Sequence, residues 1–272
     1  MPELPEVETT RRGIEPHVVG MRVREVIVRR YDLRQPVSPS ITTLQGCVIR
    51  AVRRRSKYLL LDIDDGTTLL IHLGMSGSLR AIAPADIWKK HDHVGISLEN
   101  GMQLRFHDPR RFGLVLHLTD NDPMAHVLLS SLGPEPLENE FTGKNLHSIC
   151  QKRTAAIKLV IMDSKVVVGV GNIYASEALF RAGIRPQTAA NKLSKPRVEK
   201  LVASIRAVLT DSIEAGGTTL RDFLHSDGEP GYFKQRLFVY DRKGEPCRVC
   251  EKPIRHEVLG QRSTYWCPQC QK

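Results

Sequence analysis

The sequence opens with a proline and a glutamate that could work together as a covalent catalyst. Pro2 follows the initiator Met, and a small second residue generally permits removal of that Met. The mature chain would then begin with a secondary amine, which can attack an electrophilic carbon and form an iminium, as a lysine does in a Schiff base. Glu3 lies beside this amine and could exchange a proton with a bound reactant. The alternative is a frayed terminus with ordinary prolines and glutamates.

Four of the six cysteines have the spacing of a metal site. Two Cys-x2-Cys pairs, separated by 16 residues, consist of Cys247, Cys250, Cys267 and Cys270. This pattern matches two thiolate pairs closing on one tetrahedral zinc ion, and four protein ligands leave no open position for a substrate. We therefore expect one structural zinc. Disulfides are the alternative, which a reducing compartment disfavours, and Cys47 and Cys150 are expected to be buried or inert thiols.

The composition is that of a basic globular protein. Its 272 residues carry 40 Lys and Arg against 30 Asp and Glu, a formal net charge of +10. Such an excess favours polyanionic partners through release of counterions. No apolar stretch approaches the roughly 18 residues of a membrane span, and no signal pattern is visible, so we expect a cytoplasmic protein with no membrane partner.

The elements that must position these residues change from strands to helices along the chain. We expect a helix over 4–18, then short strands between residues 22 and 118 that form an antiparallel sandwich. The expected strands contain the apolar runs 26–28, 47–49, 58–61, 68–71, 94–96, 104–106 and 114–116. A linker over 133–137 is expected to lead into helices over 146–162, 172–182 and 195–215. The fold class is thus α/β multidomain (α+β), and the segment with the four zinc cysteines ends the chain. The expected domains are 1–132, 133–240 and 241–272.

Several motifs, taken in order, resemble one protein family. They are Met1-Pro2-Glu3-Leu4-Pro5-Glu6-Val7-Glu8-Thr9, Ser56-Lys57-Tyr58-Leu59, His72-Leu73-Gly74-Met75-Ser76-Gly77, Lys90-His91-Asp92-His93, Asp108-Pro109-Arg110-Arg111-Phe112-Gly113, Val168-Gly169-Val170-Gly171-Asn172-Ile173-Tyr174-Ala175-Ser176-Glu177 and the four cysteines. Together they resemble bacterial formamidopyrimidine-DNA glycosylases, which remove oxidised purines such as 8-oxoguanine. The likeness runs from residue 2 to residue 270. It implies a helix-two-turn-helix module between the sandwich and the zinc-finger hairpin.

The resemblance implies roles for the candidate catalytic residues. Pro2 would attack C1′ of the damaged nucleotide, and the iminium would permit β,δ-elimination of the 3′ and 5′ phosphates. Glu3 would be the general acid, with Glu6 as a supporting carboxylate in the same pocket. Lys57 would contact phosphate and transfer a proton, and Arg262, beside a hairpin tip, would grip a phosphate. The alternative for Lys57 is a solvated charge in a basic run, and the alternative for Glu6 is an ordinary charge at a helix N-terminus.

Base excision from duplex DNA requires the base to leave the stack, and side chains must fill the space it leaves. The resemblance assigns this to Met75, Arg110 and Phe112. Met and Phe can wedge between base steps, and Arg can offer donors to the unpaired cytosine. Taken separately, Met75 and Phe112 are more often core residues, although neighbouring glycines favour exposed turns.

The remaining expected contacts are to DNA phosphates. Lys158 and Asn172 are the preferred ligands, together with His91, Arg110 and Arg153. A packed histidine at a strand edge is an equal alternative for His91. Gly169 and Gly171 would let backbone N–H groups approach a phosphate. A dinucleotide site is the alternative for these glycines, but no βαβ unit precedes them. The loop over 216–240 is expected to cover the everted base.

The leading functional hypothesis is a bifunctional DNA glycosylase and abasic-site lyase, acting as a monomer on double-stranded DNA in the bacterial cytoplasm and associated with the nucleoid. One rival is the endonuclease VIII type, which shares the fold and prefers oxidised pyrimidines. Another is a non-catalytic, zinc-dependent DNA-binding protein.

Overall fold

The computed structural model describes residues 2–83, 86–217 and 236–272. These residues form two compact units, the first from residues 2–130 with 215–217 and the second from residues 131–214 with 236–272. None of the described helices is long and apolar enough to cross a membrane.

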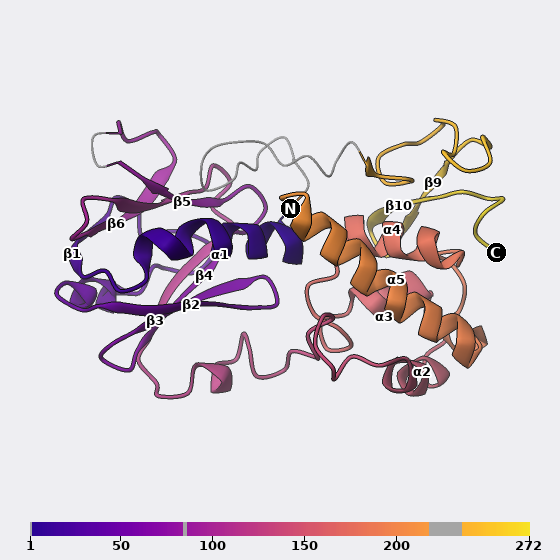
Figure 1. The fold of residues 1–272 in the computed structure, drawn as a ribbon, viewed down its shortest axis with the longest axis horizontal. Coiled ribbons are helices and arrows are strands. Elements are labelled where there is room, and N and C mark those ends of the chain that lie inside the picture. Colours follow the sequence, from indigo (N-terminus) through magenta and orange to yellow (C-terminus); the bar gives the residue numbers. More distant parts are fainter. Residues whose placement is uncertain (1, 84–85, 218–235) are drawn as a thin grey trace. The chain divides into compact units, whose positions relative to one another are not determined.

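The first unit contains one helix and two four-stranded antiparallel sheets (Figure 1). One sheet has the order β1-β6-β7-β5, formed by Val23–Val28, Asp92–Leu98, Gln103–His107 and Ser78–Ile82. The other has the order β2-β3-β4-β8, formed by Ile49–Arg55, Tyr58–Ile63, Thr68–His72 and Leu114–Leu118. Apolar side chains from both sheets pack in one core, as expected for a sandwich.

The helix α1 (Leu4–Val18) packs against β2, β3 and β5. Its apolar residues recur at helical spacing, so that Val7, Ile14 and Val18 all face the same core and are at most 1% exposed. The bounds of this helix agree with the sequence-based prediction. Its burial fixes the start of the chain on the sandwich.

Strand β5 was absent from the sequence-based prediction. Its five residues include Ser78 and Arg80, so the apolar run is too short to stand out. The strand forms because it pairs with β7 at the edge of a sheet and lies against α1. A tertiary contact therefore decides its structure.

The second unit is helical and ends in a hairpin. Its helices are α2 (Gly143–Gln151), α3 (Ile157–Met162), α4 (Asn172–Ala182) and α5 (Lys195–Glu214), and its strands are β9 (Arg255–Leu259) and β10 (Arg262–Trp266). Short 3-10 turns occupy Pro39–Leu44 and Pro123–Ala125 in the first unit and Ala190–Lys192 in the second. Helices α4 and α5 pack against each other, and α4 also contacts β10.

The prediction of one continuous helix over 146–162 was wrong. The chain leaves α2 after Gln151 and re-enters a helix at Ile157. Between them the backbone bonds to a distant segment instead, because Ala190 N–H donates to Ala155 O at 2.9 Å and Asn191 N–H donates to Arg153 O at 3.0 Å. These long-range bonds replace helical ones, and helical periodicity could not reveal them.

Candidate functional site

The N-terminal residues lie at the start of α1 in a fixed arrangement. Glu3 is the N-cap residue, and the Glu6 Oε2 accepts a hydrogen bond from the Glu3 N–H at 2.8 Å. Pro2 is buried, and the Glu3 and Glu6 side chains are 2% and 0% exposed. The two glutamates form a capping box, which satisfies backbone donors at the helix start. This terminus is ordered and buried rather than frayed, although Met1 lies outside the described residues.

Lys57 occupies a tight turn that is tied to the same helix. Ser56 and Lys57 connect β2 and β3, with Arg55 opposite Tyr58 and Ser56 in the left-handed region at φ 56°. Arg54 Nη1 donates to Ser56 O at 3.0 Å, while Arg54 Nε lies 3.2 Å from Glu8 Oε2 on α1. Glu8 lies about 7.5 Å along the helix axis from Glu3. Arg54 thus connects the Lys57 turn to α1, one to two helical turns from Pro2.

His72 lies beside this turn and was not predicted as a site residue. Its ring packs on Tyr58 at 4.9 Å, and its Nδ1 accepts the Gly74 N–H at 3.0 Å. Burial, followed by the charges of Lys57 and Arg34, lowers the pKa of His72 to about 4. A neutral imidazole here fixes the turn that carries Met75. The pairing of Tyr58 with His72 across two strands is visible only in the structure.

Asp108 joins the two loops that carry Met75, Arg110 and Phe112. Its carboxylate accepts bonds from Ser76 Oγ at 3.1 Å and from the Gly113 N–H at 2.8 Å. Asp108 is fully buried, so these bonds are protected from water. The sequence contained a signal for this role, since Asp before Pro commonly starts a turn that binds its own backbone.

The same two loops meet at glycines. Gly74 has a φ of +68°, and a Cβ on it would lie 2.5 Å from the backbone nitrogen of Gly113. No side chain fits there, so glycine is required for the close approach. Phe112 is 44% exposed and the Arg110 guanidinium lies 5.0 Å from its ring centre, whereas Met75 is half-buried. The loops present an exposed aromatic and a cation rather than core residues.

Lys158 and Asn172 meet in the second unit. The Lys158 ammonium donates to Asn172 Oδ1 at 2.7 Å, Ser263 O at 3.0 Å and Thr264 Oγ1 at 2.7 Å. Asn172 Nδ2 also donates to Ser263 O at 3.0 Å. An ammonium has three donors, and the Lys158 side chain is 0% exposed. This cation therefore joins α3, the start of α4 and β10.

Arg262 lies at the tip of the hairpin, as the sequence predicted. Leu259 and Arg262 are paired, and the two residues between them have positive φ values, 54° for Gly260 and 62° for Gln261. This is the geometry of a two-residue type I′ turn, which a glycine favours. Arg262 is exposed, whereas the Arg153 guanidinium is engaged by Asp163 at 2.8 Å.

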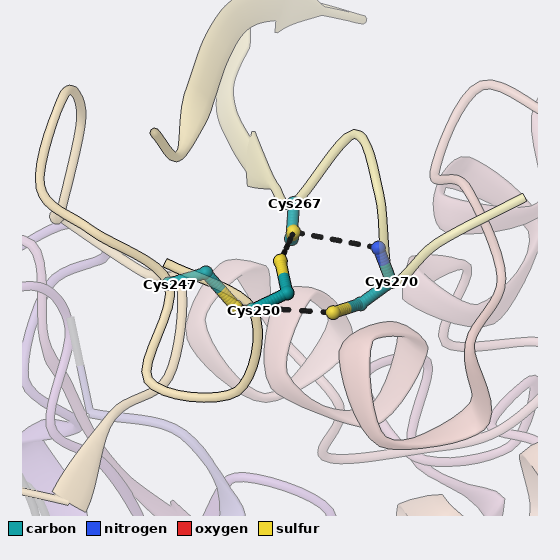
Figure 2. A group of neighbouring side chains, drawn as sticks. All are labelled: Cys247, Cys250, Cys267 and Cys270. Atoms are coloured by element: carbon teal, nitrogen blue, oxygen red, sulfur yellow. Dashed lines mark hydrogen bonds between the residues drawn. The ribbon is translucent and has the colours of Figure 1, made fainter. Parts of the chain in front are cut away.

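The four predicted zinc cysteines come together at the base of this hairpin (Figure 2). Their sulfur atoms lie within 4.8 Å of one another, with Cys250 Sγ to Cys267 Sγ at 3.4 Å and Cys247 Sγ to Cys270 Sγ at 3.9 Å. A tetrahedron with Zn–S bonds of about 2.3 Å has edges of about 3.8 Å, so the donor set fits zinc. Backbone N–H groups of Val249 and Cys270 point at the Cys247 and Cys267 sulfurs, as expected for thiolate ligands.

The other two cysteines are free thiols. Burial raises the pKa of Cys150 to about 11, which makes it inert. Cys47 is only half-buried, and burial together with Asp65 raises its pKa. Both agree with the expectation of unreactive thiols.

Glu177 is a buried carboxylate that sequence analysis did not single out. Its two oxygens accept the N–H groups of Phe238, Val239 and Tyr240, each at 2.9 Å. Burial raises its pKa, while these three bonds oppose that rise. Glu177 thus anchors the chain that leads into the zinc hairpin. Most of the loop over 216–240, which was predicted to cover the everted base, lies outside the described residues.

Comparison with protein families gives three matches that follow one another along the chain. Residues 1–115 match the formamidopyrimidine-DNA glycosylase N-terminal domain, residues 132–224 match the formamidopyrimidine-DNA glycosylase H2TH domain, and residues 244–272 match a zinc finger found in FPG and IleRS. Formamidopyrimidine-DNA glycosylases from Methylococcus capsulatus and Xanthomonas axonopodis pv. citri are 58% and 54% identical, with 100% of both chains covered in each case.

This chain belongs to the formamidopyrimidine-DNA glycosylase family. The full-length likeness favours the purine enzyme over the endonuclease VIII type and over a non-catalytic DNA-binding protein. It also agrees with one structural zinc in the cysteine site.

Solved structures of the family have the same fold. MutM (Fpg) of Thermus thermophilus is 38% identical, with a TM-score of 0.89 over 99% of this chain and 98% of its own. Lactococcus lactis Fpg in complex with abasic-site DNA is 32% identical, with a TM-score of 0.92 over 99% of each chain. A mutant of the latter enzyme, bound to DNA containing Fapy-dG, has a TM-score of 0.93 at 32% identity over 100% of each chain. The predicted α+β architecture is confirmed.

Proposed function

We propose that this protein removes oxidised purines from duplex DNA and cleaves the resulting abasic strand, with the Pro2 nitrogen as nucleophile. The supporting observation is the buried arrangement of Pro2, Glu3 and Glu6 at the start of α1. The positive end of the helix dipole lies at this point and disfavours another positive charge, which favours an unprotonated amine. Removal of Met1 completes the nucleophile.

The reaction then runs through the sugar. The Pro2 nitrogen forms a bond to C1′, and the electron pair of the glycosidic bond leaves with the base, which takes up a proton. Glu3 supplies a proton to the base or to O4′ of the sugar ring. The Pro2 amine loses its own proton, and the C1′–O4′ bond breaks with its electrons going to the protonated O4′, which opens the ring and leaves an iminium at C1′. Glu6 holds Glu3 in place by accepting a hydrogen bond from the Glu3 backbone N–H. Loss of the C2′ proton from the iminium eliminates the 3′ phosphate, and a second elimination releases the 5′ phosphate.

The space left by the everted base is filled from the first unit. We propose that Phe112 and Met75 enter the base stack and that Arg110 donates hydrogen bonds to the orphaned base. Asp108 and His72 support them by holding the two loops together. Lys57 contacts a DNA phosphate and transfers a proton close to Pro2, and His91 contacts another phosphate of the DNA backbone.

The second unit supplies further phosphate contacts through Asn172, Arg153 and Arg262. Lys158 supports these contacts as a positioning residue, because the three donors of its ammonium group already bind Asn172, Ser263 and Thr264. The four cysteines would hold the zinc ion, which would tie the two cysteine pairs together and so fix the hairpin that carries Arg262. Its role is structural because all four ligands come from the protein.

Replacing Lys158 by Met distinguishes positioning from direct contact. We expect duplex affinity to fall about tenfold while the slope of log affinity against log salt stays unchanged, because no cation is withdrawn from a phosphate. A direct contact would instead reduce the slope by about 0.9. Binding would be measured by fluorescence anisotropy at several salt concentrations, with Lys200→Met on α5 as the control for a lost surface charge. A reduced slope for Lys158→Met alone would restore Lys158 to the phosphate ligands.

We also propose domains at 1–132, 133–240 and 241–272, with catalytic, helix-two-turn-helix and zinc-finger roles. The protein would act as a monomer in the bacterial cytoplasm, close to the nucleoid.

The segment expected to be a linker is packed at its first residue, because a Cβ on Gly133 would lie 2.6 Å from Lys165 O. The chain therefore packs as it enters the helical module.

The decisive experiment compares duplexes that carry 8-oxoguanine or an oxidised pyrimidine. We expect cleavage of the purine lesion to be strongly preferred. Glu3→Gln should lose base excision by about 100- to 1,000-fold, because a general acid contributes on that scale, while some scission of a preformed abasic site remains. Glu15→Gln, on the same helix, is the control. Equal loss of both steps in Glu3→Gln would contradict the assigned role of Glu3, and preference for the pyrimidine would contradict the substrate.

A further inference from the structure

A pocket of about 390 Å³ lies in the first unit, and its lining is strongly basic. The basic residues that line it are Arg29, Arg30, Lys90, His91, His93 and Arg111. Asp92 also lines it, but its carboxylate is 1% exposed and binds Arg105 at 3.4 Å and His107 at 2.7 Å. The charge of Asp92 is therefore compensated behind the pocket wall, and the pocket itself favours an anion.

An exposed carboxylate orients two of the arginines. Asp32 accepts two bonds from Arg30, at 2.7 Å and 3.1 Å, and one from Arg111 Nη1 at 2.7 Å. Each guanidinium has five N–H donors, so both retain donors for another oxygen anion. The Asp32 carboxylate shows that an oxyanion can be held by both arginines at once. Forked donors of this kind suit a phosphate.

A third arginine is held by contacts of its own. Arg29 Nη1 donates to Lys89 O at 3.0 Å, and its guanidinium lies 5.2 Å from the centre of the Trp88 ring. The cation is thus positioned before any ligand arrives. Binding an anion then costs little side-chain entropy, which favours a specific site over a diffuse charged surface.

The pocket wall and the loop that carries Arg110 and Phe112 share the backbone of Asp108. Asp108 N–H donates to His91 O at 2.9 Å, and His93 Nε2 lies 2.8 Å from Asp108 O. Arg110 lies over the Phe112 ring, whereas Arg111, between them in sequence, has a left-handed backbone and binds Asp32 instead. In this loop, Arg110 and Phe112 therefore serve the proposed contact with the orphaned base, whereas Arg111 lines the basic pocket.

We infer that this pocket binds a backbone phosphate of the DNA duplex, close to the base step that Phe112 enters, through Arg30 and Arg111. The inference rests on the proposed function for the loop, and adds to it a phosphate site formed by Arg30 and Arg111, beside the Arg29 cation that lines the same pocket. A volume near 390 Å³ accommodates a phosphate together with its sugar, because pockets for small organic groups begin at about 300 Å³. The ligand chemistry is a phosphodiester within a polymer rather than a free phosphate.

The test uses duplexes with a non-cleavable abasic analogue, in which single phosphates near the lesion are replaced by neutral methylphosphonates. For the wild-type protein, one such replacement should weaken binding about tenfold. The double variant Arg30→Gln/Asp32→Asn keeps the net charge of the protein. It should bind the unmodified duplex about tenfold more weakly. A methylphosphonate at that same position should then cause no further loss of affinity, because the amino-acid changes and the methylphosphonate remove the same contact. Arg111→Gln should behave likewise and reduce the salt slope by about 0.9.

The control is Arg50→Gln/Asp64→Asn, which alters another exposed ion pair of the same unit, 3.9 Å apart. It should keep the wild-type affinity and the wild-type pattern of sensitivity. If the Arg30 and Arg111 variants lost affinity on every methylphosphonate duplex by as much as the wild type does, the losses would be additive and the proposal would be overturned. Calorimetric binding of inorganic phosphate that is lost in these variants, with DNA affinity unchanged, would assign the pocket to a free anion instead. Cleavage of an 8-oxoguanine duplex by the wild type, measured separately, tests the proposed function itself.

Discussion

A protein whose Pro2 nitrogen is blocked by an uncleaved N-terminal tag should bind lesion DNA and yet form no covalent complex under borohydride. The reason is chemical: in the unblocked protein the iminium between Pro2 and C1′ is reduced to a stable amine. An amide at Pro2 has a delocalised lone pair and cannot form this intermediate. Excision should fall by at least about 1,000-fold, since the whole covalent route is lost.

The measurement is a gel assay of cross-linked protein, followed by mass spectrometry of the linked peptide. We expect the link on the peptide that begins at Pro2, which requires Met1 to be absent. The matched control is the same protein after the tag has been removed to leave Pro2 first, and it should recover trapping. Binding to the abasic analogue should be equal before and after removal, because the DNA contacts are unchanged. If the blocked protein still cross-links, the nucleophile is a lysine, and Lys57 is the first to examine.

Among the expected effects on DNA binding, loss of the zinc site should be the largest. Replacing Cys250 by Ser leaves three thiolates, so we expect the metal to be lost and the hairpin to unfold, because metal binding supplies its folding free energy. Arg262 would be displaced, and Ser263 and Thr264 would no longer hold Lys158 and Asn172. DNA affinity should fall about 100-fold, as expected when two contacts of about 1.5 kcal/mol each are lost.

Zinc content would be measured by atomic absorption, and DNA affinity by anisotropy. The first unit should remain folded, since its core contains no residue of the hairpin, and its strand signal by circular dichroism should persist. Cys47→Ser is the control, because Cys47 lies outside the cysteine cluster. It should keep one zinc per chain and full affinity. Full affinity in a zinc-free Cys250→Ser protein would show that the metal does not support DNA binding.

The sequence by itself determined the elements whose signal is local. Helix α1 has apolar residues at helical spacing and a glutamate at each end of its capping box, so Leu4–Val18 was predictable. The zinc site was predictable because two Cys-x2-Cys pairs can satisfy one tetrahedral ion wherever the intervening chain runs. The hairpin tip was predictable because Gly260 permits a positive φ. In each case the constraint lies in residue types and spacings that the sequence itself displays.

Long-range contacts decided the rest. Strand β5 exists through its pairing with β7, and the break between α2 and α3 exists through bonds to residues 190 and 191. The family resemblance suggested Lys158 as a phosphate ligand, yet the acceptors of its ammonium group lie up to 106 residues away. Burial without those acceptors would carry a large desolvation penalty, so only the tertiary structure could show how this charge is held. The same holds for Arg111, whose partner Asp32 is 79 residues distant, and the pocket they border is a product of the fold.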